Sequence, residues 1–184
     1  MANQLSGLAL IVVVCLIRLP NRNDNLIGDQ ASLVIFSDYQ SASCREASPW
    51  LHQLRRQYSD GLRIVIKHSP LPDHPRSFLA ARAAFCAACH GRFWEYHERL
   101  FTVSDLTEPM LLKYAVEIGL DEFDFEQCLE SDASRDAVTK DREEALSLKL
   151  SSLPAFVLDG RVLIGVHSLD DLLREVWSVR SRKS

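Results

Sequence analysis

The chain has 184 residues, of which 47% are hydrophobic and 25% are charged, and its formal net charge is −4. This composition is typical of a globular domain with a sizeable core. The slightly acidic balance excludes binding driven by a basic surface, so we expect neither nucleic acid nor an anionic membrane surface as a partner. Five cysteines are too few for a disulfide scaffold, and their odd number leaves at least one thiol unpaired within a monomer.

The first 31 residues combine an apolar segment with a polar linker. Leu8–Ile17 has the length of a signal-peptide core, but it is shorter than the about 20 residues that span a bilayer. No Lys or Arg precedes this segment, and no small-residue cleavage site follows it before Arg18. Its β-branched residues also suit a buried strand. We expect a signal or membrane anchor here, with a strand or a misplaced start codon as the open alternatives.

Strand and helix patterns alternate in the next part of the chain. Leu33–Phe36 is a short apolar run typical of a central strand, and Ser43–Tyr58 is an amphipathic helix. Leu62–Lys67 alternates apolar and charged side chains and predicts a second strand, whereas three prolines in Ser69–Pro75 predict a loop. Helical patterns then fill an insertion at about 76–148. The expected helices are Ala80–Cys89, Phe93–Phe101, Met110–Ile118, Phe123–Glu130 and Arg135–Leu148.

Strand patterns return after the helical block. Ala155–Leu158 and Val162–Ile164 predict a hairpin that turns at an Asp-Gly pair, and Leu169–Trp177 predicts a last helix. Strands on either side of a block of helices are typical of an α/β sheet with a helical insertion. The pattern predicts one such domain over 32–178, followed by a basic tail at 179–184.

A single cysteine lies in the first turn of the helix after the first strand. Cys44 comes three residues after Ser41, which is the layout of a dithiol redox site with serine in the first cysteine position. Disulfide exchange needs a thiolate for attack and a second thiol to release the mixed disulfide. Serine does not ionise usefully near pH 7, so we expect Ser41 to cap the helix rather than to act as a nucleophile. Ser43 and Glu46 form an alternative capping box.

Several motifs along the chain resemble those of DsbA-like thiol–disulfide oxidoreductases. The motifs are FSDYQ at 36–40, LPxHP at 71–75, GRFWEYH at 91–97 with LF at 100–101, and LPAFV at 153–157. Their order and spacing match from about Leu33 to Val176. The resemblance implies a thioredoxin-like fold with an inserted helical subdomain, which agrees with the pattern of strands and helices.

The same resemblance implies roles for individual residues. Pro154 matches the cis-proline of the family, which helps to bind extended substrate peptides together with the preceding Leu153. Cys44 aligns with the second, resolving cysteine, and Ser41 aligns with the nucleophile. Asp38, next to this site, is expected to give polar support or to accept a proton. The implied partners are protein or peptide thiols and disulfides, and the implied location is extracytoplasmic (periplasmic or membrane-anchored), with the cytoplasm as an open alternative.

Cys86 and Cys128 lie at positions where relatives often carry cysteine. The resemblance therefore implies a structural disulfide within the helical insertion, with two reduced core thiols as the alternative. A disulfide there would indicate an oxidising compartment.

The motif CAACH at 86–90 also matches a haem-attachment pattern. It lies within the Ala-rich helix that leads to the FWEYH block, whereas a haem needs room beside its two thioether bonds. A zinc site at this place would lack the second cysteine pair. We therefore expect no cofactor and no metal. We interpret three histidines as loop or helix-surface residues rather than ligands: His74, His90 and His97.

The replaced thiol leaves three functions open. The first, which we expect, is a DsbA-like oxidoreductase with weak or single-thiol disulfide exchange through Cys44. The second is a non-catalytic peptide-binding or chaperone-like module that uses the groove near Pro154. The third is a glutathione-dependent transferase or isomerase, in which Ser41 would orient a glutathione thiolate.

Overall fold

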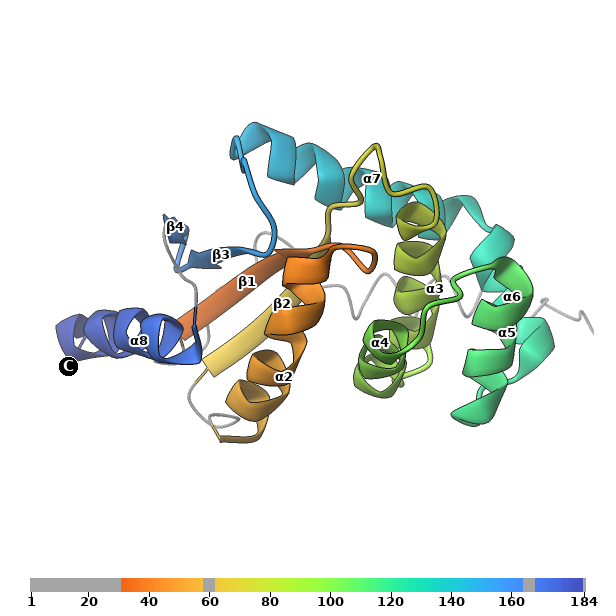
Figure 1. Ribbon diagram of the computed structural model, residues 1–184, viewed down its shortest axis with the longest axis horizontal. Coiled ribbons are helices and arrows are strands. Elements are labelled where there is room, and N and C mark those ends of the chain that lie inside the picture. Colours follow the sequence, from red (N-terminus) through yellow and green to blue (C-terminus); the bar gives the residue numbers. More distant parts are fainter. Residues whose placement is uncertain (1–30, 58–61, 164–167, 184) are drawn as a thin grey trace, which may run out of the picture.

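A four-stranded sheet in the order β2-β1-β3-β4 forms the centre of the fold (Figure 1). The computed structural model describes residues 31–57, 62–163 and 168–183, so the expected signal or anchor segment lies outside the described residues. β1 (Ala31–Ser37) runs parallel to β2 (Leu62–His68) and antiparallel to β3 (Ala155–Leu158), which pairs with β4 (Arg161–Leu163). The mixed α/β sheet with a helical insertion, as expected from the sequence, is confirmed.

The hairpin between β3 and β4 turns over two residues. Leu158 pairs with Arg161, and the two residues between them have positive φ angles, 46° at Asp159 and 83° at Gly160. A two-residue turn with both central φ angles positive follows the twist of the strands, and Asp-Gly is a favoured sequence for it.

Helices cover both faces of the sheet, and the alternation of side chains decides which face each strand residue meets. Leu33 and Ile35 of β1 pack with α2 (Ala42–Gln57) and α8 (Leu169–Lys183). Phe36 points to the opposite face, where it belongs to a cluster with residues at the end of α7 (Asp132–Ser147). Because β1 is covered on both faces, its apolar residues form a continuous run.

Five helices between β2 and β3 form the inserted subdomain. They are α3 (Ser77–Cys89), α4 (Phe93–Thr102), α5 (Glu108–Glu117), α6 (Glu122–Glu130) and α7 (Asp132–Ser147). Figure 1 shows α3 to α6 beside the sheet, while α7 extends from them over the sheet. The expected helices are confirmed within a few residues at each end. The last helix is longer than expected, since α8 continues to Lys183, and residues 179–183 are therefore helical rather than a tail.

A disulfide joins α3 to α6 within this subdomain. It links Cys86 and Cys128, which are 42 residues apart, and both side chains lie in the core of the insertion. α3 supplies many small residues to this core, such as Ala80, Ala83 and Ala84, which are fully buried. Small side chains let neighbouring helices approach α3 closely.

We expect the double variant Cys86→Ala/Cys128→Ala to be less stable than the wild type. A disulfide that closes a loop of this length restricts the unfolded chain, so loss of the disulfide lowers the free energy of unfolding by about 3–4 kcal/mol. Urea denaturation followed by circular dichroism measures the change. Cys44→Ala retains the disulfide and serves as the control for removing a buried thiol. An unchanged midpoint in the double variant would contradict a stabilising role.

Candidate functional site

The candidate site lies where the C-terminal end of β1 turns into α2. The backbone N–H of Ser41 donates to the carbonyl of Asp38 (3.2 Å), which closes a tight turn. The backbone N–H of Cys44 donates to Ser41 Oγ (3.3 Å). Ser41 therefore caps the first turn of α2, as expected from the sequence, and the helix begins before the alternative cap at Ser43.

Cys44 is enclosed beneath this cap. Its side chain is 2% exposed and belongs to the same buried cluster as Tyr39 and Tyr96. Burial raises the pKa of the Cys44 thiol, and hydrogen bonds that include one from Ser41 only partly oppose this effect. Since the thiolate is the nucleophile, a raised pKa and low exposure both slow reactions at this sulfur. Cys44 is a free cysteine in the described structure.

Asp38 connects the helix start to the loop between β2 and α3. Its side chain is 2% exposed. One carboxyl oxygen accepts from the backbone N–H of Gln40 (2.7 Å) and from the hydroxyl of Ser77. The other accepts from the backbone N–H of Leu71 (2.8 Å) and lies 2.8 Å from His74 Nδ1. Through both oxygens, Asp38 connects the turn after β1 to the loop between β2 and α3.

The Leu153–Pro154 peptide bond is cis and lies beside the same end of β1. Ala155 pairs with Phe36 in the antiparallel register of β1 and β3, so Pro154 comes next to the residues that follow Phe36. This register brings Pro154 to the end of the sheet at which Ser41 also lies. Leu153 packs partly buried between the core of the insertion and the cluster under α7.

Two buried histidines lie behind the helix start. His97 of α4 is 1% exposed, and its Nδ1 lies 2.8 Å from the hydroxyl of Tyr39. The ring of His68, at the end of β2, lies 5.6 Å from the ring of Tyr39. Burial lowers the pKa of His68 to about 4 and that of His97 to about 3, so both imidazoles are neutral near pH 7.

The expectation that His97 lies on a helix surface was wrong. Phe93, His97 and Phe101 follow one another at intervals of four residues on α4, and their rings stack or meet edge to face in the interior. This spacing was a signal in the sequence that places His97 on the apolar side of the helix. His74 lies in the loop before α3, and His90 ends α3, as expected.

The disulfide removes the basis of the haem alternative. The sulfur of Cys86 is bonded to Cys128, so it does not fit a thioether bond to a haem. The part of the chain that the structure describes contains no group of three or more His, Cys, Asp or Glu residues placed to hold a metal ion.

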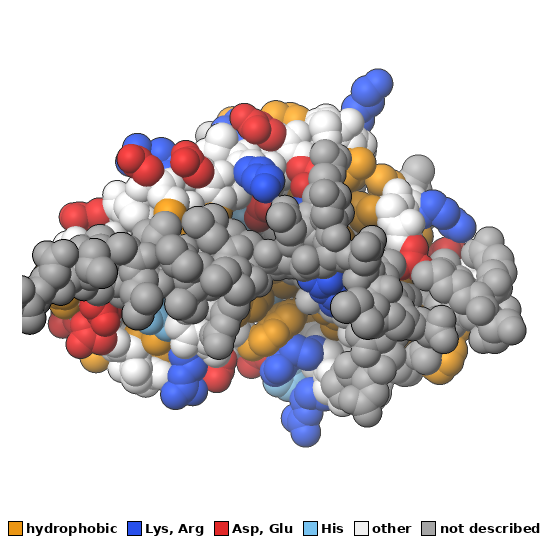
Figure 2. Space-filling model, turned by 180° about the vertical axis from the view of Figure 1, so that it is seen from behind, with side chains coloured by type: hydrophobic (Ala, Val, Ile, Leu, Met, Phe, Trp, Pro, Cys, Tyr) orange, Lys and Arg blue, Asp and Glu red, His pale blue; other side chains and the backbone are white. Residues whose placement is uncertain are grey.

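The surface of the described residues carries charges of both signs. In the view from behind, Lys and Arg side chains are interspersed with Asp and Glu side chains (Figure 2). Among the described helices, none is both long and apolar enough to cross a membrane.

A sheet with this strand order, a cis-proline beside the start of α2 and a helical insertion define a thioredoxin-like fold of the DsbA type. The profile of the DSBA-like thioredoxin domain matches residues 32–176, and the chain belongs to this family. The fold as a whole resembles a thioredoxin-like oxidoreductase from Silicibacter pomeroyi, with a TM-score of 0.72 and 26% identity over 85% of this chain and 89% of that one. It also resembles the thiol-disulfide exchange protein α-DsbA2 from Wolbachia pipientis, with a TM-score of 0.74 and 16% identity over 93% and 96% of the two chains.

Curated relatives with similar sequences are longer proteins. The chain is 36% identical over 139 residues to a Na⁺/H⁺ antiporter NhaA from Herminiimonas arsenicoxydans, covering 75% of this chain and 22% of the antiporter. A Na⁺/H⁺ antiporter from a Mycobacterium species matches at 35% over 85% of this chain and 27% of that protein. The chain thus spans about a quarter of the length of these relatives.

We expect Asp38→Ala to destabilise the domain, because it leaves the buried donors of two loops without an acceptor. The free energy of unfolding should fall by at least about 2 kcal/mol. Asp73→Ala, at an exposed residue of the loop between β2 and α3, is the matched control and should change stability by less than about 0.5 kcal/mol. Urea denaturation of both variants tests this. Equal stability of the two variants would contradict the supporting role of Asp38.

We also expect the Cys44 thiol to react slowly in the folded protein. Its low exposure and raised pKa should make the reaction of Cys44 with Ellman's reagent at pH 8 at least about tenfold slower than in 6 M guanidinium. Cys44→Ser identifies the signal that belongs to this thiol. A native rate equal to the denatured rate would mean that Cys44 is accessible.

Proposed function

We propose that this domain acts on protein or peptide thiols and disulfides as an oxidoreductase of impaired activity. The observation that carries the proposal is the hydrogen bond from the backbone N–H of Cys44 to Ser41 Oγ. A hydroxyl occupies the place at the helix start where the unpaired N–H groups and the helix dipole would favour a thiolate. Membership of the family supports thiol–disulfide exchange as the reaction. The serine at the helix start supports a low activity in that reaction.

The reaction that this site permits is limited to a single thiol. The Cys44 thiolate attacks one sulfur of a partner disulfide, a mixed disulfide forms, and the other partner sulfur leaves as a thiolate. No second thiol stands at Ser41 to attack the mixed disulfide, so its release needs a thiol from a second molecule. Because Cys44 is also buried, even the first step is slow.

The cis-Pro154 turn supports an extended polypeptide as the partner. It lies at the edge of the sheet where β1 ends and α2 begins. Membership of the DSBA-like family implies that the cis-proline helps to bind extended substrate peptides. The disulfide between Cys86 and Cys128 supports an oxidising, extracytoplasmic location. Ion transport is not carried over from the antiporters, since the chain matches only about a quarter of their length.

A non-catalytic peptide-binding module is the second candidate. The burial of Cys44, at 2% exposure, favours it, because a domain that only binds peptide needs no accessible sulfur. The glutathione-dependent function stays a prediction of the sequence.

We expect the wild type to show negligible turnover in an insulin-reduction assay with dithiothreitol, and Ser41→Cys to restore substantial activity. The variant places a thiol at the helix start, where its pKa is lowered, and leaves Cys44 to release the mixed disulfide. We expect an increase of at least about tenfold in rate.

Ser43→Cys is the matched control. It also adds a thiol beside Cys44, but at an exposed position two residues past the cap, so it should stay close to the wild type. Strong activity of the wild type would contradict impairment. Failure of Ser41→Cys in a folded protein would favour the non-catalytic module.

A further inference from the structure

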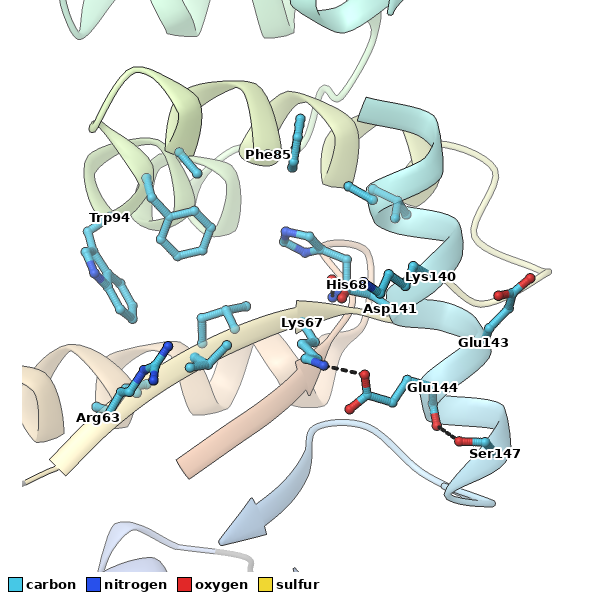
Figure 3. Close-up of a pocket in the computed structure, with 17 residues that line it drawn as sticks. Arg63, Lys67, His68, Phe85, Trp94, Lys140, Asp141, Glu143, Glu144 and Ser147 are labelled. Carbon is cyan, nitrogen blue, oxygen red and sulfur yellow. Dashed lines mark hydrogen bonds and ion pairs between the residues drawn. The ribbon is translucent and has the colours of Figure 1, made fainter. Parts of the chain in front are cut away.

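A cavity of about 690 Å³ lies between β2 and the helical insertion (Figure 3). Its walls come from β2, α3, α4 and α7. Its volume lies in the range of sites for small molecules, about 300–1,000 Å³. None of Ser41, Cys44 and Pro154 lines it, so it is separate from the candidate site.

The inner part of the cavity is aromatic. Phe85 from α3, Phe93 and Trp94 from α4, and Ile64 and Ile66 from β2 line it. Figure 3 shows His68 between Phe85 and the strand, with its ring turned toward the space between the walls. Aromatic rings from α3 and α4 favour a flat, apolar guest, because aromatic groups gain most from stacked or edge-to-face contact.

His68 is the polar group at the inner end. Its side chain is 6% exposed, and its Nδ1 has no hydrogen-bond partner. A buried polar group without a partner is unfavourable, and a guest that supplies one gains affinity. A hydroxyl suits either tautomer of a neutral imidazole, since it both donates and accepts.

The charged side chains that line the cavity balance one another. Three cationic and three anionic side chains line the cavity: Arg63, Lys67, Lys140, Asp141, Glu143 and Glu144. Lys67 and Glu144 form an ion pair with each other, and Asp141 accepts from the backbone N–H of His68 (2.9 Å). With equal numbers of both signs, the rim gives no net attraction for an ion.

We propose that this cavity binds an uncharged aromatic molecule with a hydroxyl group, with its ring among Phe85, Phe93 and Trp94 and its hydroxyl at the His68 imidazole. The proposal does not rest on the proposed disulfide chemistry. Ser41→Cys should leave binding unchanged, so the two proposals fail separately.

The test is a ¹H–¹⁵N chemical-shift titration of the full chain with three probes of similar size. The probes are p-cresol, toluene, which lacks the hydroxyl, and benzoate, which carries a charge. We expect p-cresol to shift signals in residues 62–68, 85–94 and 137–147 and to bind about tenfold more tightly than toluene, the ratio that one hydrogen bond supplies. Benzoate should bind more weakly than p-cresol.

Two variants locate the interaction. His68→Phe should remove the preference for p-cresol over toluene, and His52→Phe, at a half-exposed histidine on α2, should retain it. If His68→Phe fails to fold, Ala88→Phe provides a second test, because it fills the cavity from α3 and should abolish binding of both probes. No shifts at these residues with p-cresol at millimolar concentration, equal affinity for toluene, or tighter binding of benzoate would overturn the proposal.

Discussion

The four hydrogen-bonding contacts of Asp38 fix the geometry on which the candidate site depends. They come from Gln40, Leu71, His74 and Ser77, and so they join the turn after β1 to the loop after β2. This carboxyl group is buried, as is its hydrogen bond from Ser77, and the other three contacts are partly buried, so removal of the carboxyl group would leave donors without an acceptor. The turn is therefore held in one conformation, and the first N–H groups of α2 face outward at a defined place. This arrangement positions Ser41 Oγ to accept the hydrogen bond from the backbone N–H of Cys44.

Under the proposed function, an oxygen at Ser41 in place of a sulfur would change the chemistry and preserve this geometry. A serine cap accepts the same backbone hydrogen bond that a thiolate would accept, so the helix start needs no charge to remain stable. The sulfur of Cys44 lies one turn further in and belongs to the same buried cluster as Tyr39 and Tyr96. In a two-cysteine site the inner thiol reacts after the outer one has engaged the substrate. Under the proposed function, Cys44 corresponds to the inner thiol, and there is no outer thiol at Ser41 to attack the substrate first.

Local patterns in the sequence predicted the elements well, because β1, β2 and the helices each have a clear apolar periodicity. The cis-proline at Pro154 came from the resemblance rather than from the pattern, and its proximity to Ser41 was not predicted, since more than a hundred residues separate the two and only the β1–β3 register joins them. The partners of Asp38 could not be predicted, because loop residues from two different connections supply them. The error at His97 arose from treating a histidine as a surface residue, although its spacing from Phe93 and Phe101 placed it on the apolar side.

The end of β2 connects the two proposed sites. β2 is an outer strand of the described sheet, and His68 at its end lines the cavity while its ring lies 5.6 Å from that of Tyr39. Tyr39 in turn lies between Asp38 and the cap, and its hydroxyl meets His97. A guest bound to His68 would therefore contact a side chain whose ring lies beside Tyr39, in the turn that leads to Ser41. Since Asp38 already holds the turn, such a contact can add rigidity to the helix start but places no thiol at Ser41.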